Sequence, residues 1–256
     1  MLFAPLDRWL APAPAAAKAA WLGGCDYAHR GLHSAGVPEN SPSACAAAMA
    51  RGMGVECDVQ RASDGQAVVF HDATLDRLTG ESGPLAERSA AELGRITLSG
   101  SSDTIPSLRQ FLDQIQGQVP VLIEIKSVRG SRGKAAALCL AVRRVLEGYL
   151  GPHAIMSFDP RMVRWFSAHS PQTVRGLVVT EEHAKTLIGM IKRRLSLWHA
   201  RPDFLAYDIR DLPSRFAAAQ RARGLPLLTW TVRSAEHRER AAKYADAPIA
   251  EGAGAA

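Results

Sequence analysis

Short apolar runs alternate with amphipathic segments along most of the 256 residues of this chain. The runs with strand-like patterning are Tyr27–His29, Gly54–Gln60, Ala67–His71, Val119–Lys126, His153–Phe158, Val174–Val179, Phe204–Ile209, Leu225–Val232 and Ala247–Ala250. The segments with helical periodicity are Ser41–Arg51, Ser89–Gly94, Ser107–Ile115, Lys134–Tyr149, Pro160–Ala168, Glu181–Trp198, Ser214–Arg223 and Ser234–Lys243. Strand followed by helix, repeated about eight times, predicts an α/β protein with a (β/α)₈ TIM-barrel fold. An open doubly wound sheet shows the same alternation and is the alternative.

Breaks in this alternation divide the chain. Residues 1–24, rich in alanine and proline, are predicted to form a helical extension, and residues 25–256 a single barrel domain. The turn signal at Ser63-Asp64-Gly65 predicts that the second and third strand-like runs form a hairpin. Residues of about 74–104 have fewer apolar repeats, so we expect an insertion after this hairpin. The predicted helix N-caps are Ser41, Ser214 and Ser234.

Carboxylates alternate with apolar residues in two of the predicted strands. Glu56 and Asp58 are two residues apart, and Glu124 stands in the same relation to Lys126. Residues two apart in a strand share a face, so each pair should point to the interior of the barrel. Three inward carboxylates favour a hard divalent cation, Mg²⁺ or Ca²⁺, over zinc. The alternative is a structural network in which buried Arg or Lys side chains neutralise the carboxylates.

Two histidines and two basic residues complete a candidate site. His29 and His71 end predicted strands, at the end where barrel enzymes place their chemistry. A pair of histidines with pKa values near neutrality can supply one general base and one general acid. Arg30 and Lys126 provide positive charge for a phosphate group.

The composition narrows the range of expected binding partners and cellular compartments. The formal net charge of +6 and the pI of about 9.4 favour anionic ligands. No stretch interleaves basic and aromatic residues, so a nucleic-acid partner is not expected. The four cysteines are scattered, which suggests free buried thiols and fits a reducing compartment. No long apolar run and no secretory signal are apparent, and we expect a cytoplasmic protein.

An ordered set of motifs is more specific than any of these features. The motifs are His29-Arg30-Gly31, Pro38-Glu39-Asn40, Glu56-x-Asp58, His71-Asp72, Leu75-Asp76-Arg77-Leu78-Thr79-Gly80, Ile105-Pro106-Ser107-Leu108, Glu124-Ile125-Lys126, Ser157-Phe158 and Trp230-Thr231-Val232. In this order they resemble the glycerophosphodiester phosphodiesterases, relatives of the phosphatidylinositol-specific phospholipases C. The resemblance spans most of the chain and is strongest in its first half.

The resemblance implies a barrel enzyme that hydrolyses glycerophosphodiesters to an alcohol and glycerol 3-phosphate. It implies a divalent cation at Glu56, Asp58 and Glu124, and catalytic histidines at His29 and His71. It also implies substrate contacts from Arg30, Lys126 and Trp230. Glu39 and Asn40 fit either the site or a loop that caps the next helix. After Trp230-Thr231-Val232 the chain departs from the family pattern, because Arg233 stands where the family often has Asn. This departure leaves the choice of substrate open.

Three other functions remain open from the sequence. A lysophospholipase D-like enzyme would act on membrane lipids, and a non-catalytic barrel would only bind phosphodiesters. A phosphate-binding barrel of isomerase or aldolase type is the third. The segment 186–199 mixes apolar residues with Lys192, Arg193 and Arg194, so it is either an outer barrel helix with a buried apolar stripe or a weak peripheral membrane contact. The oligomeric state is not predicted.

Overall fold

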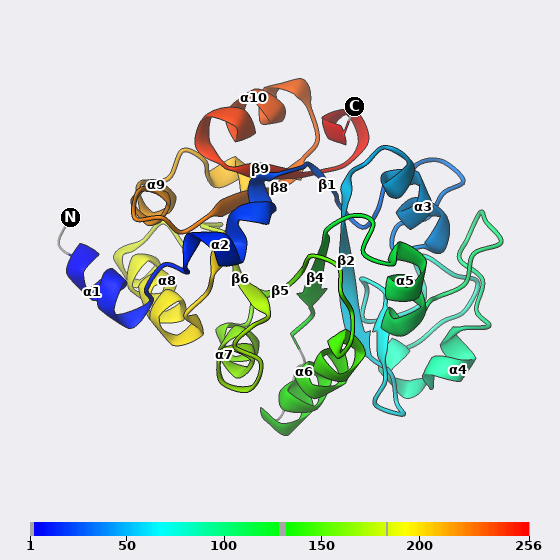
Figure 1. The fold of residues 1–256 in the computed structure, drawn as a ribbon. Helices are drawn as coiled ribbons and strands as arrows, with labels where there is room; N and C mark the ends of the chain where they lie inside the picture. Colours follow the sequence, from blue (N-terminus) through cyan, green and yellow to red (C-terminus); the bar gives the residue numbers. More distant parts are fainter. Residues whose placement is uncertain (1–2, 128–131, 183, 256) are drawn as a thin grey trace. The chain divides into compact units, whose positions relative to one another are not determined.

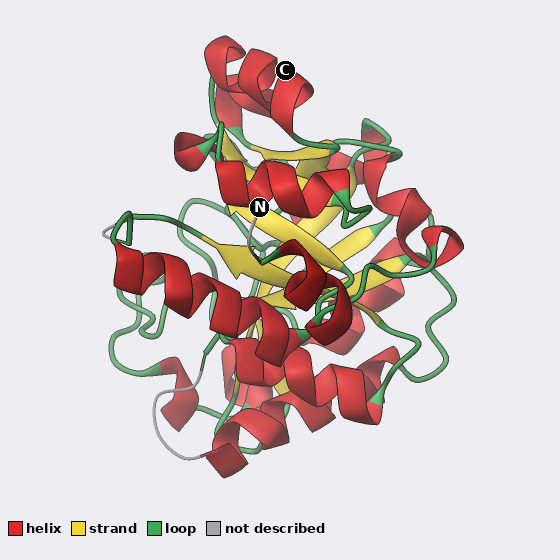
Figure 2. Cartoon of the chain, turned by 90° about the vertical axis from the view of Figure 1, so that its left-hand side faces the viewer, coloured by secondary structure: helices red, strands yellow, loops and turns green. Residues whose placement is uncertain are grey.

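The computed structural model describes residues 3–127, 132–182 and 184–255. These residues form two compact units (Figure 1). One unit is Tyr27–His153, and the other combines Met1–Asp26 with Ala154–Ala256. Figure 2 shows helices in red lying against strands in yellow, and within each unit every strand pairs with at least one other.

The unit Tyr27–His153 contains a small parallel sheet with one antiparallel strand. Its strands are β1 (Tyr27–Ala28), β2 (Gly54–Arg61), β3 (Ala67–Val69) and β4 (Val121–Ile125). Its helices are α3 (Pro42–Ala50), α4 (Ala90–Leu93), α5 (Leu108–Ile115) and α6 (Arg132–Leu146). Strand β2 lies between β1 and β4, parallel to both, and also pairs with β3 as the predicted antiparallel hairpin.

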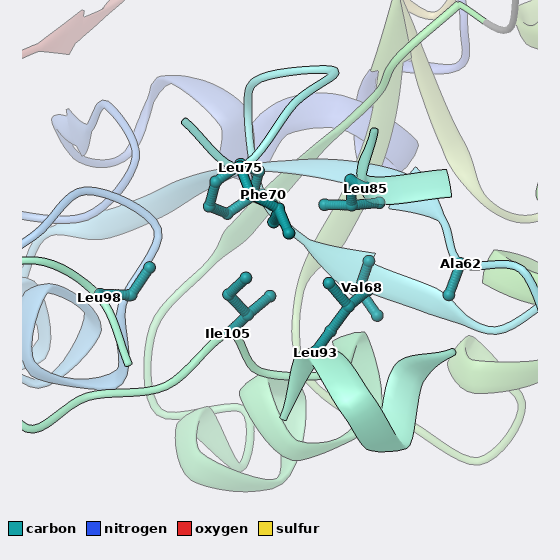
Figure 3. Packing of buried hydrophobic residues seen from close by; sticks show 8 residues of the cluster. All are labelled: Ala62, Val68, Phe70, Leu75, Leu85, Leu93, Leu98 and Ile105. Carbon is teal, nitrogen blue, oxygen red and sulfur yellow. The ribbon is translucent and has the colours of Figure 1, made fainter. Parts of the chain in front are cut away.

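A separate hydrophobic cluster stabilises the segment after this hairpin. Its members are Ala62, Val68, Phe70, Leu75, Leu85, Leu93, Leu98 and Ile105, all buried (Figure 3). Val68 and Phe70 come from the hairpin, and Leu85 and Leu93 come from short helical turns that follow it. The segment therefore packs onto the hairpin through sparse apolar residues brought together by loops, which is why its periodicity in the sequence is weak.

The other unit contains five strands in parallel order. They are β5 (His153–Ser157, beginning one residue before the unit), β6 (Val174–Val179), β7 (Phe204–Asp208), β8 (Leu227–Val232) and β9 (Ala247–Ala250). Its main helices are α1 (Ala4–Leu10), α2 (Ala16–Ala19), α7 (Pro160–His169), α8 (Leu187–Ala200), α9 (Arg215–Ala222) and α10 (Ala235–Tyr244). Neighbouring strands β5 to β9 are all paired in parallel.

Helix α1 lies within the predicted helical extension of residues 1–24, and a buried carboxylate explains its position. Asp7 is only 3% exposed and accepts hydrogen bonds from Trp198 Nε1 at 2.8 Å and Gln220 Nε2 at 2.9 Å. These donors lie about two hundred residues away in the chain, as the sequence separations of 191 and 213 show. Local propensity contains no information on such distant partners, so the sequence pattern alone did not reveal what α1 packs against.

The strand predictions agree with the structure to within a few residues, and Ser41, Ser214 and Ser234 are N-caps as predicted. The main difference is α8, which begins at Leu187 where Thr186 caps it, six residues after the predicted start at Glu181. Residue 183 of that predicted helix lies outside the described residues. In the described part of the chain, no helix has the length and hydropathy needed to cross a bilayer.

Candidate active site

Three carboxylates meet on one face of the sheet formed by β2 and β4. Asp58 and Glu124 are direct partners in the parallel register, and Glu56 lies two residues before Asp58 on the same face. One oxygen from each side chain lies within 4.8 Å of the others. All three residues are buried, with exposed fractions of 1%, 1% and 8% for Glu56, Asp58 and Glu124. The predicted alternation therefore produces the predicted cluster.

Two cations border this cluster. Lys126 Nζ lies 2.6 Å from both Asp58 Oδ1 and Glu124 Oε1. The backbone N–H of Arg30 donates to Glu56 Oε2 at 2.9 Å, while its Nε lies 3.2 Å from Asp58 Oδ2 as an ion pair without hydrogen-bond geometry. The alternative of a Glu124–Lys126 ion pair is thus present in the structure, and it coexists with the carboxylate cluster.

The loop before α3 holds Asp58 from the other side. Asn40 Nδ2 donates to Asp58 Oδ2 at 2.9 Å, and Asn40 Oδ1 accepts from the Asp58 backbone N–H at 3.1 Å. Asn40 and Arg30 both have positive φ, 58° and 57°, and the Asn40 N–H donates to the Arg30 carbonyl at 2.8 Å. Left-handed conformations of residues other than glycine collect at functional sites. Asn40 is therefore part of the site, a role that the sequence left open.

Gly31 explains the third position of the His-Arg-Gly motif. Its φ is +75°, and a Cβ atom there would lie 2.8 Å from backbone and side-chain atoms of Ala44. The Gly31 N–H also donates to the Glu56 carbonyl at 3.2 Å. Only glycine allows this approach, which keeps the preceding residues against β2.

Burial raises the pKa values of two of the carboxylates, whereas neighbouring cations lower that of the third. Burial, followed by the charges of Asp58 and Glu124, raises the pKa of Glu56 well above its usual range. Burial and the charge of Asp58 also raise the pKa of Glu124. Burial acts to raise the pKa of Asp58 too, but Lys126 and Arg30 outweigh it and hold that pKa at about 2. When all three carboxylates are ionised, the cluster has more negative charge than its two cations neutralise.

One oxygen of the cluster lacks a protein partner. Glu56 Oε1 is buried and accepts no hydrogen bond, and among the described residues it is the only carboxylate oxygen in that state. A buried acceptor without a donor is costly unless something else satisfies it. Three hard oxygen donors, an unsatisfied oxygen and excess negative charge fit a divalent cation.

The two predicted histidines flank this sheet. His29 directly follows β1, whose last residue, Ala28, pairs with Val55 of β2. His71 reaches the site because β3 runs antiparallel to β2 and returns the chain toward Asp58, whose carbonyl accepts from the Phe70 N–H at 2.9 Å. His71 therefore arrives through the hairpin and does not end a parallel barrel strand.

A network of acids and arginines surrounds His71. His71 Nδ1 lies 2.6 Å from Asp72 Oδ1, and Arg77 Nε donates to Asp72 Oδ2 at 2.5 Å. Arg77 also binds Glu39 through two hydrogen bonds of 2.7 and 3.1 Å. Glu39 in turn accepts from Arg30 Nη1 at 2.7 Å. Arg77 thus connects Asp72, the partner of His71, to Glu39, the partner of Arg30. Strand periodicity could not reveal this arrangement, because Asp72, Arg77 and Glu39 all lie in loops.

Electrostatics in this network affect both the histidine and the aspartate. Burial lowers the pKa of His71, although Asp58 and Asp72 act in the opposite direction. The hydrogen bonds from Arg77 lower the pKa of Asp72 to about 2. Asp72 is therefore ionised at neutral pH and His71 is mainly neutral.

Trp230, the last predicted site residue, belongs to the other unit. It is partly buried in β8, its Nε1 donates to the Ala206 carbonyl at 2.9 Å, and its ring meets Phe158 edge to face at 5.4 Å. Phe158 is 44% exposed. Trp230 and Phe158 therefore form an aromatic pair that reaches solvent, and the substrate contact of Trp230 stays a prediction.

Comparison with known proteins bears on this geometry. The model of the glycerophosphoryl diester phosphodiesterase family matches residues 29–250. The chain belongs to this family. A glycerophosphodiester phosphodiesterase of Caldanaerobacter subterraneus subsp. tengcongensis is 27% identical over 229 residues, which cover 84% of this chain and 88% of that protein.

Solved structures agree on the fold. A phosphodiesterase of Oleispira antarctica, in complex with the product sn-glycerol-3-phosphate, matches with a TM-score of 0.76 at 24% identity, covering 88% of this chain and 92% of that chain. A glycerophosphodiester phosphodiesterase of Parabacteroides distasonis matches with a TM-score of 0.73 at 19% identity, covering 88% and 92%. The predicted family, the (β/α)₈ barrel class and the class of phosphoric diester hydrolase are confirmed.

Proposed function

We propose that this chain hydrolyses sn-glycero-3-phosphodiesters to an alcohol and sn-glycerol 3-phosphate with a bound divalent cation. The observation that carries this proposal is the buried cluster of Glu56, Asp58 and Glu124, with its unsatisfied oxygen, beside two cations and a paired histidine. The family match and the product in the Oleispira antarctica structure support the substrate class.

The three carboxylates are the proposed ligands of Mg²⁺ or Ca²⁺. Their oxygens converge from two adjacent strands, and Asn40 fixes the position of Asp58. When bound, such a cation supplies Lewis-acid polarisation of phosphoryl or hydroxyl oxygen. Because Lys126 touches both Asp58 and Glu124, its ammonium group can hold a phosphate oxygen at the edge of the same cluster.

Arg30 is the second proposed phosphate ligand. Its guanidinium lies between Glu39 and Asp58, and these carboxylates fix its direction. A guanidinium can bind two phosphoryl oxygens at once. Together with Lys126 it would stabilise the negative charge that grows on those oxygens in the transition state.

His71 is the proposed general base. Asp72 accepts from Nδ1, so in the neutral ring Nε2 carries the lone pair and is the atom that takes a proton. The lowered pKa of His71 keeps this base in its active form near neutral pH. His29 is then the proposed general acid that protonates the departing alcohol. The proton acceptor acts on a neighbouring glycerol hydroxyl or on water.

Arg77 is proposed as a positioning residue. It touches neither a proposed metal ligand nor His71 directly, but it binds the acids that orient His71 and Arg30. Asp72 is only partly buried, so without Arg77 it could rotate away from the imidazole. The fork geometry of arginine suits two carboxylates at once, which a lysine cannot reproduce fully.

The experiment is an activity panel of glycerophosphodiesters and lysophospholipids. Each substrate is tested with EDTA and after addition of Mg²⁺ or Ca²⁺, and glycerol 3-phosphate is measured. We expect release of glycerol 3-phosphate from glycerophosphodiesters, its loss with EDTA and its return with one of the two ions. If His29→Ala and His71→Ala each kept near-wild-type turnover, the proposed acid–base pair would be wrong. Turnover of lysophospholipids alone would support the lysophospholipase D-like alternative.

A further inference from the structure

Helix α8 exposes most of its apolar side chains. Leu187, Ile188, Met190, Ile191 and Leu195 are between 42% and 69% exposed. Positions 187, 188, 191 and 195 fall on one side of a helix. The alternative that α8 buries this apolar stripe therefore fails, because the buried side is formed by Gly189, Leu197 and Ala200.

Helix α1 also exposes apolar side chains. It lies beside α8 (Figure 1) and exposes Leu6 at 41% and Trp9 at 76%. The two helices are joined by the bond from Trp198 to Asp7 and by Arg194, whose guanidinium lies 4.4 Å from the Phe3 ring centroid. We call the exposed apolar residues of α1 and α8 the α1–α8 face.

Helix α8, which contributes most residues of the α1–α8 face, is anchored to the rest of its unit. Arg193, on the inner side of α8, lies 3.4 Å from Glu181 and over the ring of Phe216. The Thr186 cap accepts from the Gly189 N–H at 3.1 Å and fixes the start of the helix. The apolar residues thus remain outside although α8 is anchored on its opposite side.

The exposed charged residues of helices α1 and α8 are all basic. Helix α8 contains no Asp or Glu, and the one acid of α1, Asp7, is buried with both oxygens bonded. Arg8 of α1 and Lys192 of α8 are exposed. The face is therefore apolar and basic, with no carboxylate exposed on either helix.

We propose that the α1–α8 face binds the surface of an anionic lipid bilayer. Leucine and isoleucine side chains on such a helix enter the boundary between headgroups and acyl chains, and tryptophan favours the same depth. The basic residues complement anionic headgroups. A protein partner is less suitable, because the cores of protein interfaces are depleted in lysine and the exposed Lys192 lies on the same helix as most of these apolar residues.

The test is co-sedimentation of the full chain with lipid vesicles. One vesicle contains phosphatidylglycerol and phosphatidylcholine, and the other phosphatidylcholine alone. We expect binding to the anionic vesicle that weakens as salt rises. The double variant Ile188→Glu/Ile191→Glu should bind at least about tenfold more weakly, because it removes apolar area and adds like charge to the lipid.

A matched control comes from the other unit. Leu150 is 98% exposed, so Leu150→Glu adds a negative charge at an exposed apolar position that belongs to neither helix, and it should bind like wild type. All variants should keep wild-type turnover of a soluble glycerophosphodiester, which separates this proposal from the proposed function. Equal binding to both vesicles, absence of binding, or unchanged binding of the double variant would overturn it. Dimerisation that the double variant abolishes, seen by light scattering without vesicle binding, would assign the face to a second copy instead.

Discussion

Each unit contains three acidic side chains in or just after its parallel strands. The hydrogen bonds and ion pairs of these side chains differ between the two units. In the unit of β5 to β9 these are Glu181, Asp208 and Asp211, whose side chains are 13%, 2% and 6% exposed. Glu181 accepts from Tyr207 and from Ser214 Oγ, and Asp208 is paired with Arg210 through several hydrogen bonds. Asp211 accepts from the Glu181 N–H and lies 3.4 Å from Lys185.

The cluster in the unit Tyr27–His153 differs in one decisive respect. Its three carboxylates share two cations, and Glu56 Oε1 accepts no hydrogen bond. Burial of acids is therefore not what marks a site. A set of carboxylates with all partners in place stabilises the fold, whereas a set with an unsatisfied oxygen and surplus charge is suited to bind a cation.

The strongest way to test this difference is Glu56→Gln. We expect about a 10³-fold loss in kcat, because a metal ligand and its charge are removed. Without metal, the free energy of unfolding should stay equal or rise, since one buried negative charge is removed from a repulsive cluster. Steady-state kinetics and urea unfolding in EDTA measure the two effects. Near-wild-type kcat in Glu56→Gln would show that the cluster is not the metal site.

Arg77→Met tests whether the loop network belongs to the functional cluster. We expect a loss of about 10- to 100-fold in kcat, with partial rescue in Arg77→Lys, because Asp72 and Glu39 lose their common partner. The control is Arg88→Met, which removes an exposed arginine of the same unit that pairs with Glu81 at 3.6 Å. Equal losses in both variants would mean that Arg77 acts only through general stability.

The substitution Glu181→Ala tests the acidic residues in the unit of β5 to β9. Removal of this acid takes away a carboxylate that Tyr207, Ser214 and Arg193 share as a partner. We expect the free energy of unfolding to fall by about 1–3 kcal/mol, while kcat of the folded enzyme stays near wild type. Urea unfolding and active-site-normalised kinetics measure these quantities. A large loss of kcat without loss of stability would contradict a purely structural role.

The pH dependence of kcat/KM tests the proposed role of His71 as general base. The folded-state pKa of His71 lies below the usual 6.5, and the base must be neutral, so activity should fall only as pH drops below 6.5. Asp72 acts to raise this pKa, so Asp72→Asn should move the acidic limb of kcat/KM to lower pH. A limb that stays in place in Asp72→Asn would remove His71 as the group that titrates.

The local pattern was enough for much of the fold and for most of the site. Strict alternation placed Glu56 and Asp58 on one face of their strand, and Glu124 and Lys126 on one face of theirs, because a strand repeats every two residues. The turn at Ser63-Asp64-Gly65 predicted the hairpin that brings His71 back to β2. Both inferences depend on interactions between residues close in sequence, and for that reason they could be made without coordinates.

Only the tertiary structure determines which polar groups have hydrogen-bond or ion-pair partners and which surfaces are exposed to solvent. The pairing of Arg77 with Glu39, the unsatisfied Glu56 oxygen and the anchoring of α1 by Asp7 all depend on contacts between distant segments. The exposure of α8 depends on the same kind of contact, since its period of 3.6 residues predicts an apolar stripe but not what covers it. Sequence periodicity thus determined the faces of each element, and long-range packing determined what each face does.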